Sequence, residues 1–173
     1  MFNFRILLVL LGFCLSSVVV SCSPAPKYDY SAFRESNPAS ILVLPPINNS
    51  VEVSGEAAVF SSVVKPIAES GYYVFPPTLI TETFRQNGYT QATEIHKIRL
   101  GKLKEIFGAD AVLYITIKQF GQKFMVFKSS AIVTLEARLV DIETGTELWS
   151  GTSTASSSES SSNSGLGLAG LVA

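Results

Sequence analysis

A-V-L-Y-I-T-I, residues 111–117, is the stretch of the 173-residue chain that decides the fold. It is almost continuously apolar and rich in β-branched residues, with little alternation between apolar and polar positions. This pattern is typical of a strand that is buried on both faces of a sheet. A second stretch of the same kind, Ser40–Pro46, places four aliphatic residues before two prolines, which cannot extend a hydrogen-bonded ladder. Two such strands predict an α/β domain whose sheet is covered by helices.

Helical periodicity and stop signals fill the sequence between these two strands. We predict a turn at Asn48-Asn49-Ser50 and a helix from about Gly55, with a new turn starting at Pro66. A strand over Tyr72–Phe75 follows, and then a helix capped by Thr78 and ended by Asn87-Gly88. The last predicted helix covers Arg99–Phe107 and is ended by Gly108.

From Phe124 onward the pattern changes to antiparallel hairpins. Apolar residues at 133, 135, 137 and 139 alternate with polar residues at 134, 136 and 138, so one face of this strand should pack and the other contact water. Asp141–Gly145 supplies turn chemistry, and a returning strand begins near Leu148. The order predicts one α/β (α+β) domain over residues 40–155: a mixed sheet with helices mainly on one face, ending in antiparallel hairpins.

The amino terminus has the layout of a secretory signal. Arg5 precedes an apolar run, Ile6–Val20, that is shorter than the roughly twenty residues a membrane-spanning helix needs. The run ends in V-V-S before Cys22, which resembles the bacterial lipobox. We therefore predict a signal peptide over residues 1–21 and lipidation of Cys22, with diacylglycerol on the sulfur and a further acyl chain, such as palmitate, on the freed amine. An ordinary secreted protein or an apolar anchor helix is the alternative.

The residues that follow Cys22 predict a membrane tether. Ser23-Pro24-Ala25-Pro26 cannot continue a helix, and we assign residues 22–39 to the lipid anchor and a proline-containing tether. Ser23 stands where inner-membrane lipoproteins of enteric bacteria often carry Asp. That resemblance favours the outer membrane over the inner, with the domain facing the periplasm.

Composition excludes several classes of function. The formal net charge is −1, from 13 cations and 14 anions, so nothing indicates a nucleic-acid or anionic-lipid partner. Cys14 leaves with the signal peptide, so the mature chain has no disulfide.

Residues 156–173 form a Ser-rich and then Gly/Leu-rich tail; its first part could prolong the last strand or be a linker. The apolar end, Gly165–Ala173, looks like an incomplete helix or membrane-seeking segment.

Residues that could carry chemistry do not form a recognisable set. His96 is the single histidine and is interpreted as a surface residue, which leaves no metal site, catalytic dyad or cofactor site. The acids near the last hairpin are interpreted as exposed turn residues, the lysines of the long hairpin as guards of a sheet edge, and the aromatic residues of the short strand as core or a contact surface. The acids are Glu136, Asp141, Glu143 and Glu147. The lysines are Lys118, Lys123 and Lys128, and the aromatic residues are Tyr72, Tyr73 and Phe75.

Two segments, residues 43–50 and 66–76, resemble a family of predicted bacterial lipoproteins of unknown function that includes a meningococcal genome-derived vaccine antigen. The step F-G-A-D-A-V-L, residues 107–113, also resembles the TolB amino-terminal-domain group, to which the curli-export lipoprotein belongs. The resemblance implies a TolB-like α/β domain in the envelope. It carries over no catalytic residues.

The leading hypothesis is a non-enzymatic accessory or assembly lipoprotein of the outer membrane that binds protein partners in the envelope. The alternative is a component of a curli-export-like secretion or ligand-transport complex. The candidate partners are envelope proteins, including a curli-export-like lipoprotein, and further copies of this chain in a homo-oligomer. A hydrolase ranks third.

Overall fold

The computed structural model describes residues 28–125 and 128–157, with only the backbone described at 123–125 and 128–129. The predicted signal peptide, Cys22 and nearly all of the predicted tail lie outside these residues.

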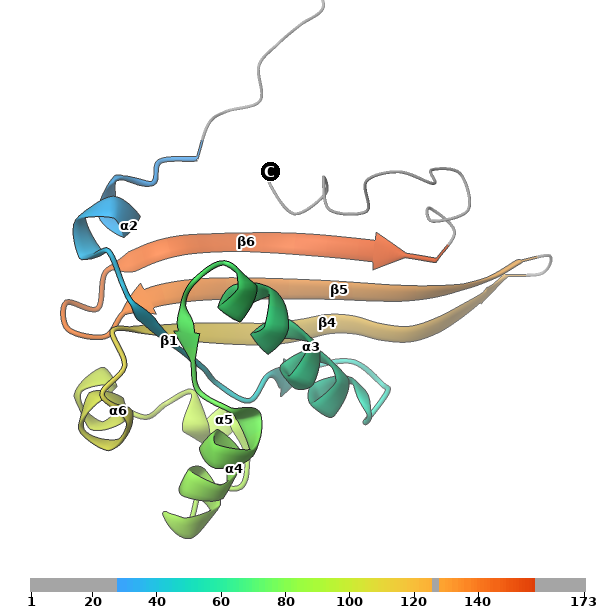
Figure 1. Ribbon diagram of the computed structural model, residues 1–173. Helices are drawn as coiled ribbons and strands as arrows, with labels where there is room; N and C mark the ends of the chain where they lie inside the picture. Colours follow the sequence, from blue (N-terminus) through green and yellow to red (C-terminus); the bar gives the residue numbers. More distant parts are fainter. Residues whose placement is uncertain (1–27, 126–127, 158–173) are drawn as a thin grey trace, which may run out of the picture.

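A six-stranded mixed sheet forms the centre of the domain (Figure 1). Its order is β3-β1-β4-β5-β6, and β2 pairs with β4. The pairs of β1 with β3 and β4, and of β2 with β4, are parallel, whereas β4, β5 and β6 form an antiparallel meander. The strand bounds are β1 Ser40–Val43, β2 Ile47–Asn48, β3 Tyr73–Val74, β4 Ala111–Met125, β5 Lys128–Asp141 and β6 Glu147–Ser156.

Helices cover both faces of this sheet. The longest helix, α3, packs on one face, where α2 also lies beside β6, and the other three helices pack on the opposite face (Figure 1). Their bounds are α2 Ser31–Ser36, α3 Gly55–Glu69, α4 Pro77–Gln86, α5 Ala92–Ile95 and α6 Leu100–Phe107. The predicted mixed sheet with terminal hairpins is confirmed. Three helices share a face as expected, and α3 covers the other because β1 is apolar on both sides.

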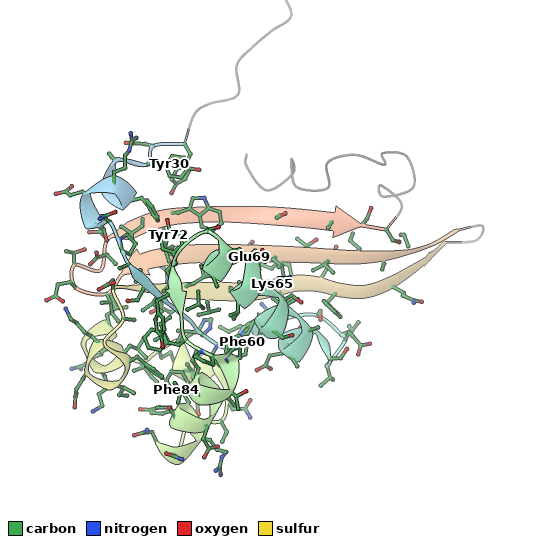
Figure 2. The ribbon with its side chains drawn as sticks, viewed as in Figure 1. Tyr30, Phe60, Lys65, Glu69, Tyr72 and Phe84 are labelled. Carbon is green, nitrogen blue, oxygen red and sulfur yellow. The ribbon has the colours of Figure 1, made fainter. Side chains whose placement is uncertain are left out.

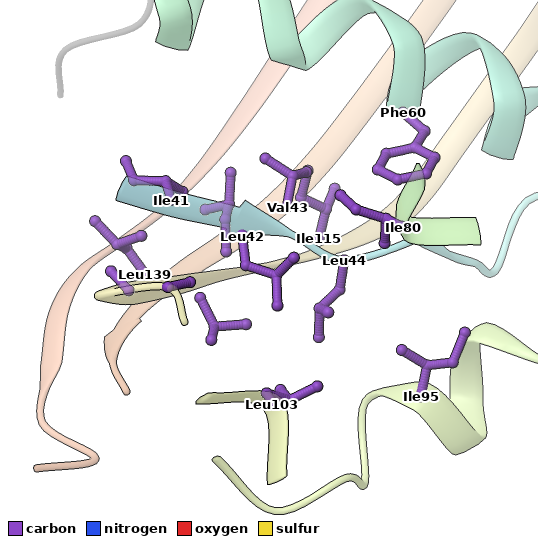
Figure 3. Packing of buried hydrophobic residues seen from close by; sticks show 14 of the residues in the cluster. Ile41, Leu42, Val43, Leu44, Phe60, Ile80, Ile95, Leu103, Ile115 and Leu139 are labelled. Carbon is purple, nitrogen blue, oxygen red and sulfur yellow. The ribbon is translucent and has the colours of Figure 1, made fainter. Parts of the chain in front are cut away.

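Strand β1 shows this two-sided burial directly. Ile41, Leu42 and Val43 of β1, and Leu44 directly after it, are each at most 4% exposed, and alternate side chains point to opposite faces (Figure 3). Figure 3 places Phe60 of α3 on one side of the strand and Leu103 of α6 on the other. Both helices therefore depend on the same four-residue strand.

The joint between α6 and β4 is tied to the start of β1 by hydrogen bonds. Gly108 has φ +67°, a left-handed conformation that favours glycine, and it ends α6. Two residues later the Asp110 carboxylate accepts hydrogen bonds from the backbone N–H groups of Ala39 and Ser40, at 3.0 and 2.9 Å. The Ser40 hydroxyl donates to the same oxygen at 2.8 Å. These bonds, that of the Ser40 hydroxyl first, hold the pKa of Asp110 below its usual value.

Several local predictions are wrong. Pro66 lies inside α3, within its last turn, where it removes a hydrogen-bond donor without ending the helix. Thr78 does not cap α4, because Pro76 takes the N-cap position and Pro77 starts the helix. Asn48 belongs to β2 as well as to the turn that follows. Residues 28–39, part of the predicted tether, instead include α2, which packs beside β6.

Adjacent positions on α4 test how much of the stability comes from the core. Ile80 is fully buried, whereas Leu79 is 51% exposed. We expect Ile80→Ala to lower the free energy of unfolding by about 2–5 kcal/mol, because it leaves a cavity. Leu79→Ala, the matched control, should change it by about 0.5 kcal/mol. Urea denaturation followed by circular dichroism measures both. Equal losses would show that α4 does not pack as described.

Candidate functional site

An apolar groove lies between α2, α3 and one face of the sheet and encloses about 520 Å³. Its floor is formed by inward-facing residues of the long strands: Leu113, Ile115, Leu135, Ala137 and Leu139. Val63, Pro66 and Ile67 of α3 form one wall, and Tyr30 and Phe33 form the other, with Tyr72 and Trp149 also on the lining. Figure 2 shows Tyr30 beside α2 and Tyr72 near α3, on which Lys65 and Glu69 are labelled. No lining residue carries a charge.

Small residues on the strands make room for the groove. Ala137 is paired with Ile115 on one side and with Gly151 on the other, so the floor is low at Ala137 and Gly151. A Cβ atom at Gly151 would lie 2.7 Å from Cζ2 of Trp149. The missing side chain at Gly151 therefore lets the Trp149 indole lie along β6, and a larger residue would displace it.

Helix α2 is fixed to the sheet by polar contacts at both ends. The Ser36 hydroxyl donates to the Asp141 carboxylate at 2.5 Å, and the backbone N–H of Ser150 donates to the Tyr28 hydroxyl at 3.1 Å. Between these contacts, Phe33 meets Tyr72 edge to face at 6.4 Å between ring centroids. The wall formed by α2 is therefore ordered rather than loosely apposed.

A second, polar cleft of about 460 Å³ lies on the opposite face of the sheet. Its lining includes His96, Tyr114, Thr116, Glu136 and Arg138. The Arg138 guanidinium lies 5.1 Å from the centroid of the Tyr114 ring, and the His96 ring meets that ring edge-on at 5.2 Å. The cation–π contact of Arg138 and the ring contact of His96 with Tyr114 explain why these three side chains lie together, and neither contact needs a catalytic role.

His96 is not the surface residue we predicted. It is half-buried at the end of α5, and its Nε2 atom lies 2.9 Å from the carbonyl oxygen of Pro45. A carbonyl oxygen only accepts, so Nε2 carries the proton. Burial lowers the pKa of His96, the Pro45 hydrogen bond opposes that shift, and the Arg138 charge adds to it. His96 is thus a neutral residue that positions α5 against the loop after β1.

Asp141 also differs from the prediction that it is an exposed turn acid. It is 9% exposed and accepts hydrogen bonds from the backbone N–H groups of Glu143 and Thr144 at 2.9 and 2.8 Å. Burial acts to raise the pKa of Asp141, but hydrogen bonds from Ser36 and Thr144 outweigh it, so the net pKa is lowered. Its role is to shape the β5–β6 turn.

The remaining acids do not converge on one point. Glu136 forms an ion pair with Lys118 at 2.8 Å, Glu143 forms one with Lys104, and Glu147 is exposed. Across residues 28–125 and 128–157, no cluster of three or more His, Cys, Asp or Glu side chains could hold a metal ion.

The predicted lysines and aromatic residues have separate positions. Lys118 lies at the β4 bulge, just past the last residue that pairs with β2, which agrees with a guard at an open strand edge. The side chains of Lys123 and Lys128 lie outside the described part of the structure. Tyr72 lines the groove, Tyr73 is 59% exposed, and Phe75 packs edge-on against Phe107.

An ordered loop beside the start of α3 presents two valines to solvent. Val51 is 99% exposed and Val53 88%. The loop that carries them is held by hydrogen bonds: the Asn48 side-chain amide donates to the Glu52 carbonyl at 2.8 Å, and the Ser54 hydroxyl donates to the Glu52 carboxylate at the same distance. Sequence patterning did not single out this loop.

None of the helices within the described residues has the length and apolar character needed to cross a bilayer.

The family model described as "Putative lipoprotein GNA1162-like" matches residues 28–173. This chain belongs to the GNA1162-like family. It is 46% identical over 160 residues to the putative lipoprotein NMB1124/NMB1162 of Neisseria meningitidis serogroup B, covering 91% of this chain and 74% of that protein. The predicted resemblance to a family of bacterial lipoproteins is confirmed.

Solved structures agree with this assignment. The crystal structure of lipoprotein GNA1162 from Neisseria meningitidis is 48% identical, with a TM-score of 0.67, covering 73% of this chain and 88% of that one. The NMR structure of Escherichia coli LpoB is 19% identical, with a TM-score of 0.50, covering 76% of this chain and 71% of that one. The second likeness concerns the fold alone. The GNA1162-like chain described here is therefore a lipoprotein-family member with a mixed α+β domain.

Gly151 provides a test of the groove wall. We expect Gly151→Ala to lower the free energy of unfolding by about 1–3 kcal/mol, because the new Cβ forces the Trp149 indole to move. Trp149 is the sole tryptophan of the chain, so its fluorescence emission should shift as well. Gly101→Ala on α6, where a Cβ meets nothing within 4 Å, is the control and should leave the emission unchanged. An unshifted Gly151→Ala spectrum would contradict the described packing.

The half-buried, neutral state of His96 predicts a pH dependence of stability. Because its pKa is lowered in the folded state, the unfolded state binds more protons as the pH falls below about 6.5, and the free energy of unfolding decreases. We expect a shallower decrease between pH 7 and pH 5 in His96→Asn, measured by urea denaturation at a series of pH values. Parallel curves for the two proteins would refute this assignment.

Proposed function

We propose that this GNA1162-like protein is an outer-membrane lipoprotein, lipidated on Cys22, that acts as a non-enzymatic accessory or assembly factor for protein partners in the envelope. Its TolB-like domain faces the periplasm. Membership of a lipoprotein family supports the anchor. The first described residue, Tyr28, follows Cys22 by only six residues, a span of at most about 22 Å, so lipidation would keep the domain near the membrane.

The observation that carries the partner-binding role is the valine loop. Val51 and Val53 are almost fully exposed on a backbone held by the Asn48 and Ser54 hydrogen bonds. Covering an exposed apolar side chain with a partner removes it from water, which lowers the free energy of the complex. Little conformational entropy is lost on binding, because hydrogen bonds already order the loop. Partner contact therefore explains a feature that folding of the domain does not require.

Absence of an enzymatic role is supported by the way the candidate chemical groups are used. His96 is bonded to Pro45, Glu136 is paired with Lys118, and Asp141 shapes a turn. Each of these groups has a structural partner that accounts for its position.

The alternative function is a component of a curli-export-like secretion or ligand-transport complex. The apolar groove favours it, because an uncharged hollow of about 520 Å³ is the size of many small-molecule sites, roughly 300–1,000 Å³.

Fractionation tests the anchor. We expect wild-type protein to sediment with outer membranes and to carry lipid, and we expect Cys22→Ser to be released or mislocalised while its domain stays folded, as seen by circular dichroism. Membrane association of an unlipidated wild-type protein would disprove the proposed anchor.

Crosslinking in whole cells tests the partner surface. We expect a photo-reactive residue at Val51 to give discrete protein adducts, and Val53→Ser in the same chain to reduce their yield several-fold. Thr81, an exposed position on α4 far along the chain from the loop, is the control site for the photo-reactive residue. Equal adducts from both sites, or none from Val51, would argue against the valine loop as a partner surface.

A further inference from the structure

The apolar groove has no charged group that would recognise a polar ligand. Its lining consists of aliphatic and aromatic residues with a few hydroxyls. Two of these hydroxyls are already used within α3: Ser62 donates to the carbonyl of Ala58 at 2.7 Å, and Ser70 donates to that of Pro66 at 2.9 Å. Water held in such a hollow would find few hydrogen-bond partners. The groove therefore suits an apolar occupant better than water or a polar metabolite.

The form of the groove indicates what kind of apolar occupant fits. Its floor follows neighbouring strands through Ile115, Ala137 and Gly151, which pair side by side, and its walls are two helices. A hydrocarbon chain can lie on this floor without meeting a charge. A polar headgroup attached to that chain would find no cation or anion inside, so it would stay outside the groove.

The position of α2 in the chain indicates the source of the occupant. Tyr30, on one wall, follows Cys22 by eight residues, a reach of at most about 29 Å. With Cys22 in the bilayer, the groove is held beside a large reservoir of lipid. Moving the protein's own anchor chains into the groove would weaken anchoring by about 0.8 kcal/mol for each methylene withdrawn. A separate lipid molecule carries no such cost to attachment.

We propose that the apolar groove binds one acyl chain of a membrane phospholipid, with the headgroup outside. This inference deepens the ligand-transport alternative and rests on the proposed anchor only for the source of the lipid. Binding itself depends on the groove, so the lipid-binding test does not require an anchored protein.

Trp149 makes the test direct, because the chain has no other tryptophan and this one lines the groove. The mature full-length chain carrying Cys22→Ser, which has no acyl chains of its own, is mixed with phosphatidylcholine vesicles in which one acyl chain is dibrominated. Bromine quenches tryptophan fluorescence on close approach. We expect saturable quenching, and no quenching with unbrominated vesicles. Absence of quenching by the brominated lipid would overturn the proposal.

Neighbouring positions on β5 supply the variant and its matched control. Ala137 faces the groove, whereas Glu136 faces the opposite side of the sheet. We expect Ala137→Phe to weaken lipid binding about tenfold or more, because the ring displaces at least two methylene groups. Glu136→Phe should bind as the parent does. Thermal unfolding checks that both variants fold. Undiminished quenching in a folded Ala137→Phe protein would place the lipid elsewhere and refute the proposal.

A crosslinking arm in cells separates phospholipid from the other occupants. A photo-reactive residue replaces Leu135 on the groove floor, and the adduct is identified by mass spectrometry. A phospholipid adduct supports the proposal. An adduct with the anchor chains on Cys22, or with a protein, overturns it. If Cys22→Ser stays on the membrane while quenching persists, the proposed anchor fails and the groove inference stands.

Discussion

Every other element of the domain depends on the two-sided pairing of β4. Its first residues pair with β1 and β2 on one side and with β5 on the other, and residues 111–113, 115 and 117 are buried. Residues 111–113 are buried on both faces of this strand, so helices cover both faces at its start, whereas Tyr114 and Thr116 further along line the polar cleft. The hydrogen bonds between Asp110 and Ser40 set the register at which β1 joins, which in turn positions everything that packs on it.

The long apolar strands and the helices with clear periodicity could be predicted from the sequence, because their patterns depend on local burial. Gly108 and the Asn87-Gly88 pair end helices where their conformations indicate. The two-residue strand β2 and the four-residue helix α5 could not, since elements of that length have no period to read. Helix α2 was missed for a further reason: its order comes from contacts with Asp141 and β6, more than a hundred residues away.

The candidate sites were harder to predict than the fold. Alternation along β5 indicated correctly which face is apolar, but α3 covers that face only in part, and the uncovered remainder is the groove. Its lining spans Tyr30 to Ser153, so it exists only once the strand register is known. His96 and Asp141 were misplaced because their environments are set by Pro45 and Ser36, partners that are remote in sequence.

The attachment of the amino-terminal segment has a mechanical consequence. Any pull on the residues before Tyr28 reaches the sheet first through the Tyr28–Ser150 and Ser36–Asp141 hydrogen bonds, which lie at β6 and at the β5–β6 turn. Force is thus applied to the meander before it reaches β1. The parallel part of the sheet, with its short strands β1, β2 and β3, is loaded only afterwards, so α2 takes up tension between the membrane side of the chain and the core.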